Sequence, residues 1–193
     1  EASTEAAAAV AQEMQGWSDL SAKGVAGLGK LLEEHQASAE LQEAAAARLG
    51  VLLAEAVKSG AAPGDDGVAP RLLAPMLIDL LKRFPRDAGV QRAGCSALHW
   101  VVKLPGGAGV VADSEGVALA GKAMKRHISD VTVCRSAALV FYAMVQVTKR
   151  NSKEMLCMRS SGYDQLLNEA LSRHPHDRPL LYAVQVAGSE LKG

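Results

Sequence analysis

A short segment recurs four times along the chain, and an internal repeat of this kind restricts the fold more than any other feature of the sequence. Each copy has two apolar residues, two polar residues and a final His or Phe, which we call the marker residue. The copies span residues 31–35, 80–84, 123–127 and 170–174. The markers are 49, 43 and 47 residues apart, yet the next apolar pattern always begins six residues after the marker. Loops between units must therefore absorb the differences in length.

Apolar residues three, four and seven positions before each marker form the stripe of an amphipathic helix. Side-chain oxygens suited to cap a second helix follow each marker: Ser38, Asp87, Asp130 and Asp177. The pattern predicts a short helix ending at each marker and a longer helix after it, over about residues 39–58, 89–104, 130–150 and 178–191. The marker histidines His35, His127 and His174 are expected to be structural caps. Gly- and Pro-rich segments at 59–70 and 105–109 are expected to be breaks between repeats, with a turn at 106–109.

Composition agrees with a helical fold, because apolar residues make up 49% of the chain and aromatic residues only 4%. Ala and Leu, both strong helix formers, supply much of the apolar content. We therefore predict an all-α chain that forms a single domain of about four stacked repeats. The expected repeats span residues 17–60, 61–104, 105–149 and 150–193, and residues 1–16 are interpreted as a helix of a preceding repeat.

Residues 116–127 followed by 133–144 resemble the second and third helices of an armadillo repeat. Residues 110–116 and 155–162 resemble the passage from the first helix to the second, and residues 89–98 give the best match to a third helix. The resemblance implies a right-handed superhelix (an α-solenoid), with HEAT-like repeats as the alternative. It also implies a protein–protein interaction scaffold or adaptor that binds a partner along its concave third-helix surface.

The importin and catenin branches of the armadillo family carry a Trp on each third helix and an Asn four residues later. The positions equivalent to the Trp are Ala47, Ser96, Leu139 and Val186, and those equivalent to the Asn are Val51, Trp100, Ala143 and Glu190. The ladder is therefore absent, which argues against binding of nuclear-targeting signals in the importin manner.

Trp100 is the sharpest candidate for partner binding. It lies on an expected third helix, next to His99 and one turn before Lys103, and an aromatic ring flanked by cationic groups is typical of an interface anchor. The expected partner-binding residues are Arg48, His99, Trp100, Lys103, Tyr142 and Gln146. The alternative is that Trp100 packs between repeats as part of the core.

Basic residues occupy equivalent positions just before three of the markers and predict a second candidate surface, which we call the basic ladder. Its members are Lys82, Arg83, Lys125, Arg126 and Arg173. Such a ladder is suited to an acidic ligand or nucleic acid. The simpler interpretation is that cations at helix C-termini are favoured by the helix dipole, by about 0.3–1 kcal/mol each. The net charge of zero also disfavours nucleic acid as the partner.

Several functional classes lack their signatures. The chain has no nucleophile elbow, no paired catalytic carboxylates and no HExxH motif, and its three cysteines have no CxxC spacing. We therefore expect no catalysis, no cofactor and no metal site. Sparse cysteines and the lack of a membrane-length apolar run favour an intracellular protein, in the cytoplasm. The chain does not start with Met, so a regulatory domain of a larger protein is a further alternative.

Overall fold

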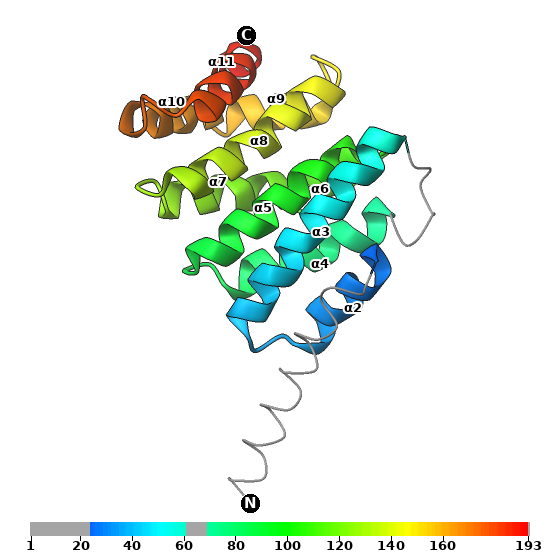
Figure 1. Cartoon of the computed structure of the whole chain (residues 1–193). Helices are drawn as coiled ribbons and strands as arrows, with labels where there is room; N and C mark the ends of the chain where they lie inside the picture. Colours follow the sequence, from blue (N-terminus) through cyan, green and yellow to red (C-terminus); the bar gives the residue numbers. More distant parts are fainter. Residues whose placement is uncertain (1–23, 61–68, 193) are drawn as a thin grey trace, which may run out of the picture.

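The computed structural model describes residues 24–60 and 69–192, and these residues form ten α-helices and no β-strand (Figure 1). The helices are α2 (Val25–Glu34), α3 (Ala39–Ser59), α4 (Pro70–Arg83), α5 (Ala88–Lys103), α6 (Gly107–Asp113), α7 (Gly116–Arg126), α8 (Val131–Val147), α9 (Lys153–Ser160), α10 (Tyr163–Arg173) and α11 (Arg178–Lys192). The all-α prediction is confirmed. The helix expected within residues 1–16 lies outside the described residues.

Each marker residue ends a helix, as the repeat pattern predicts. His35, Phe84, His127 and His174 are the C-cap residues of α2, α4, α7 and α10. A longer helix then begins at each predicted capping oxygen: Ser38, Asp87, Asp130 and Asp177 each accept a hydrogen bond from a backbone N–H of the first turn. The short and long helices of each unit are therefore α2 with α3, α4 with α5, α7 with α8, and α10 with α11.

Two boundaries differ from the prediction. The long helix α8 ends at Val147 rather than near residue 150, because Thr148 adopts an extended backbone and its hydroxyl bonds the Met144 carbonyl. Residues 107–109 are helical rather than a turn. Gly106 alone makes the turn, with a φ of 77° that suits glycine, and α6 begins at the next residue.

A short additional helix precedes the pair in the last two units, so that α6–α8 and α9–α11 are each sets of three helices. In the first two units the corresponding positions fall before residue 24 and within residues 61–68, which are outside the described part of the chain. Three-helix units are thus present where the described residues allow the comparison.

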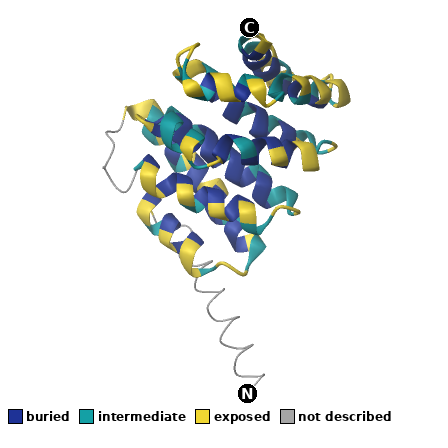
Figure 2. Ribbon diagram, turned by 180° about the vertical axis from the view of Figure 1, so that it is seen from behind, coloured by how far each residue is buried: buried dark blue, intermediate teal, exposed yellow. Residues whose placement is uncertain are grey.

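The long helices lie side by side in the order α3, α5, α8, α11, and the short helices α2, α4, α7 and α10 form a second row behind them (Figure 1). The core lies between these rows and consists largely of Leu, Val and Ala. Figure 2 shows the buried residues in the interior of the stack. Gly50 of α3 faces the Ala97 backbone of α5, and a Cβ at this position would lie 3.6 Å from that backbone, in ordinary van der Waals contact. We call the outer side of the long-helix row the third-helix surface.

The turns at the markers are tied to one another. His127 bonds through Nε2 to the Pro85 carbonyl at 3.1 Å, and His174 bonds in the same way to the Ile128 carbonyl at 2.9 Å. Arg83 donates to the Gln36 carbonyl at 3.2 Å. In each case the side chain at a helix end reaches a backbone carbonyl in the turn of the preceding unit. One side chain per unit therefore fixes the stacking of neighbouring turns.

Candidate partner-binding site

Five side chains from three successive long helices gather on the third-helix surface. We call them the aromatic–lysine site: Trp100 and Lys103 from α5, Tyr142 and Gln146 from α8, and Tyr182 from α11. The Lys103 ammonium lies 5.0 Å from the centroid of the Trp100 ring and 5.8 Å from that of Tyr142. The rings of Tyr142 and Tyr182 have centroids 5.6 Å apart. One lysine thus bridges two aromatic rings, and a third ring continues the row.

Helix geometry explains this gathering. Trp100 and Lys103 are three residues apart and Tyr142 and Gln146 four apart, so each pair lies on one face of its helix. The neighbouring long helices then bring the two pairs together. Interaction with the Tyr182 hydroxyl is the main reason that the pKa of Tyr142 is raised, and the Gln146 side chain opposes this shift. The contact between the Tyr142 and Tyr182 rings joins α8 to α11 at this site.

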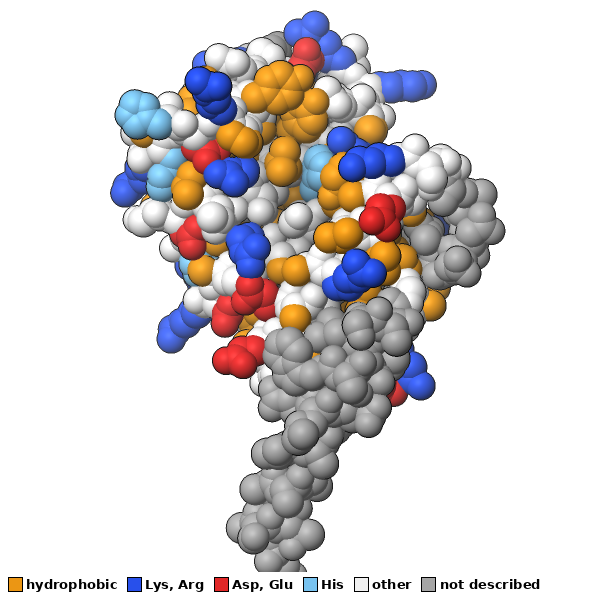
Figure 3. Space-filling model, in the orientation of Figure 1, with side chains coloured by type: hydrophobic (Ala, Val, Ile, Leu, Met, Phe, Trp, Pro, Cys, Tyr) orange, Lys and Arg blue, Asp and Glu red, His pale blue; other side chains and the backbone are white. Residues whose placement is uncertain are grey.

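The site faces solvent while resting on the core. Tyr182 is 57% exposed and Gln146 is exposed, whereas Trp100, Lys103 and Tyr142 are half-buried. Trp100 and Tyr142 also pack against the hydrophobic core. Figure 3 shows hydrophobic side chains on this face of the molecule with basic side chains beside them. The sequence left open whether Trp100 binds a partner or packs in the core. In the structure one side of the ring contacts the core and the other faces solvent.

His99 is not part of the exposed surface, although the sequence placed it beside Trp100. The residue is only 5% exposed, and Nδ1 lies 2.7 Å from the Leu139 carbonyl of α8. Burial lowers the pKa of His99 to about 4, the bond to Leu139 opposes this shift, and the charge of Lys103 adds to it. The imidazole is therefore neutral near pH 7 and its Nδ1–H donates to the carbonyl. The His99 and Trp100 rings are in edge-to-face contact, with centroids 4.8 Å apart, so the buried imidazole packs against the indole.

Arg48 is exposed on α3, but the structure does not bring it to the aromatic–lysine site. Its equivalent in the next repeat, Ala97, is buried against Gly50 of the preceding long helix. The repeat geometry therefore directs Arg48 towards the N-terminal end of the stack.

Tyr182, in contrast, was missed by the sequence analysis. The repeat pattern could have identified it. Tyr182 lies eight residues after its marker, as Arg92 and Arg135 do, and polar residues at those two positions predict that this position is at the surface of each long helix.

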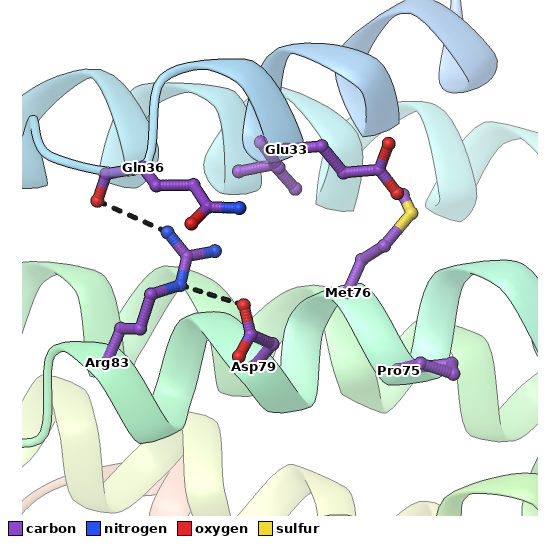
Figure 4. Close-up of a pocket in the computed structure, with 7 residues that line it drawn as sticks. Glu33, Gln36, Pro75, Met76, Asp79 and Arg83 are labelled. Atoms are coloured by element: carbon purple, nitrogen blue, oxygen red, sulfur yellow. Dashed lines mark hydrogen bonds and ion pairs between the residues drawn. The ribbon is translucent and has the colours of Figure 1, made fainter.

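The basic ladder is largely engaged in internal ion pairs. Lys82 lies 3.0 Å from Glu115, Arg83 lies 2.8 Å from Asp79, and Arg173 lies 3.2 Å from Glu169. Figure 4 shows Arg83 directed to both Asp79 and the Gln36 carbonyl, at one end of an open pocket of about 400 Å³ between α2 and α4. Lys125 and Arg126 are exposed and form no ion pair with any described residue.

A second cavity, of about 310 Å³, lies between the third and fourth units and holds the exposed thiol of Cys157. Its lining includes Glu154 and Tyr163 but no histidine to act as a base. The other two thiols are buried, and burial raises the pKa of Cys95 to about 12 and that of Cys134 to about 11. Neither of these buried thiols is therefore poised to act as a nucleophile near neutral pH.

Among the described residues, no group of three or more His, Cys, Asp or Glu side chains is arranged to hold a metal ion. None of the helices in the described ranges combines the length and the apolar character needed to cross a membrane. Comparisons of the chain with family models, curated proteins and solved structures gave no match.

Proposed function

We propose that this chain is an armadillo-like α-solenoid that binds a protein partner on its third-helix surface and does not catalyse a reaction. The three-helix units at α6–α8 and α9–α11 and the row of adjacent long helices support an armadillo-like arrangement. The free cysteines support an intracellular, cytoplasmic protein. HEAT-like stacking is the structural alternative.

The aromatic–lysine site is the single observation that carries this proposal. Trp and Tyr are enriched among the residues that dominate binding energy at protein interfaces. Here three such rings come from successive helices, and they are joined by the cation–π contacts of Lys103 and by the contact between the Tyr142 and Tyr182 rings. A partner that binds them loses less side-chain entropy than it would on freely rotating side chains, because the rings already pack against the core or against one another.

The experiment is an unbiased selection of short peptides from a random displayed library on the wild-type chain. Selected peptides are then measured by fluorescence polarisation against Trp100→Ala and Tyr142→Ala. Loss of either ring is expected to weaken binding by about tenfold or more, as is typical of interface anchors.

The matched control is Leu72→Ala on α4, because Leu72 is 62% exposed and lies in the short-helix row. This variant is expected to bind like the wild type, and circular dichroism checks that all three variants remain helical. The proposal fails if the selection yields no peptide, or if the selected peptides are indifferent to both Trp100→Ala and Tyr142→Ala.

A further inference from the structure

We propose that the partner segment is acidic and carries an apolar side chain beside a carboxylate, which binds at Lys103. This inference rests on the proposed function and specifies the partner's chemistry. It concerns the aromatic–lysine site and not the basic ladder of the short helices.

The charge of the two central long helices is the first argument. Helices α5 and α8 are described throughout, and they contain no Asp or Glu. Their basic residues are Arg92, Lys103 and Arg135. A cationic partner would therefore find no carboxylate on either helix, whereas an anionic partner finds three basic side chains.

Within the described residues, two of these three basic side chains form ion pairs with acidic residues of neighbouring helices or turns, and Lys103 does not. Arg92 is ion-paired with Glu43 of α3, and Arg135 with Asp177 at the start of α11. Glu190 of α11 lies 3.7 Å from Arg150. Lys103 forms no ion pair with any described residue. The centre of the third-helix surface thus presents an uncompensated ammonium.

The surroundings of Lys103 define what accompanies the carboxylate. Its ammonium lies over the Trp100 and Tyr142 rings, which shield it partly from water and strengthen its attraction for an opposite charge. The same rings, with Tyr182, offer apolar area on both sides of the ammonium. An aliphatic or aromatic side chain next to an Asp or Glu would cover these rings while the carboxylate meets Lys103.

A peptide fits this arrangement better than nucleic acid. Nucleic-acid binding gains affinity from several cations that follow successive phosphates. In α5 and α8, two of the three basic side chains are already neutralised by Glu43 and Asp177. A single free ammonium between aromatic rings matches one carboxylate with an apolar neighbour.

The test uses three labelled peptides that share a central Phe and differ only in its neighbours, which are Glu, Gln or Lys. Wild-type chain is expected to bind the Glu peptide about tenfold more tightly than the Gln peptide, with an affinity that falls as salt is added. Lys103→Gln is expected to abolish the preference, and Lys103→Glu to reverse it in favour of the Lys peptide. Lys125→Glu is the matched control, since Lys125 is exposed and lies in the other row of helices.

The outcomes separate this inference from the proposed function. If binding depends on Trp100 but the Gln or Lys peptide is preferred, the acidic partner is refuted and the scaffold remains. If Lys125→Glu weakens the Glu peptide as much as Lys103→Glu does, the ligand belongs to the basic ladder and the inference is wrong. If a single-stranded oligonucleotide binds more tightly than the Glu peptide and is lost in Lys103→Glu, the site serves nucleic acid instead. If no peptide responds to Trp100→Ala, the proposed function itself fails.

Discussion

The burial of His99 predicts that stability falls on mild acidification, before most carboxyl groups titrate. The folded pKa is about 4, whereas an unperturbed histidine has a pKa of 6.5. Between these two pKa values, His99 is therefore protonated in the unfolded chain and neutral in the folded chain. Because the folded pKa is lowered, the contribution of His99 to stability is present above pH 6.5 and is lost as the pH falls towards 4.

The magnitude follows from these two values. Between about pH 7 and about pH 5, preferential protonation of the unfolded chain is expected to remove about 2 kcal/mol from the free energy of unfolding. This is a large share of the typical stability of a domain, about 5–15 kcal/mol. The hydrogen bond from the Nδ1–H to Leu139 joins α5 to α8 and opposes the lowering of the pKa, because the protonated ring still donates it.

Urea unfolding followed by circular dichroism at the two pH values measures this difference. His99→Gln removes the titrating ring and keeps an amide that can donate to Leu139, so its stability is expected to change by about 2 kcal/mol less over the same interval. His176→Gln is the control, because His176 is exposed in a turn. Equal pH dependence in the wild type and in His99→Gln would refute the reasoning.

Two further predictions concern the joints between repeats. Asp177→Ala removes both the cap of α11 and the ion pair with Arg135, and it is expected to cost about 1–2 kcal/mol in urea unfolding; an unchanged midpoint would contradict this. Glu115→Gly is expected to raise the melting temperature, because Glu115 has a φ of 66° where the equivalent residue of the next unit is Gly162. Its ion pair with Lys82 is exposed and offsets only a small part of this gain, so a lower melting temperature would show that the pair outweighs the backbone strain.

Local signals were sufficient to predict most helix boundaries. Ser38, Asp87, Asp130 and Asp177 were all identified from the sequence, because a capping oxygen acts within three residues of its partner. The helix at residues 107–109 was missed, since glycine disfavours a helix. Glycine is nevertheless needed at position 107, because the backbone there lies against Val101. A Cβ at Gly107 would lie 1.8 Å from the Val101 carbonyl oxygen.

The candidate site was predicted only in part, because exposure depends on how neighbouring helices rotate. His99 and Trp100 are adjacent in sequence, yet one is buried and the other faces solvent. Trp100, Lys103, Tyr142 and Gln146 were expected at one surface, and the structure brings them together. Tyr182 joins them through a contact across 40 residues of sequence, which the periodicity of one helix cannot reveal.

The links between successive turns have a consequence for how the sequence can change. Arg83, His127 and His174 each bond to a main-chain oxygen of the preceding turn. Every amino acid supplies that oxygen, so the link constrains the donor side chain and leaves the identity of the acceptor residue free. Gln36, Pro85 and Ile128 have side chains of different shape, one polar and two apolar, and the carbonyl of each one accepts such a bond. Turns of this chain can therefore diverge without weakening the joints, provided that one long donor side chain stays at each helix end.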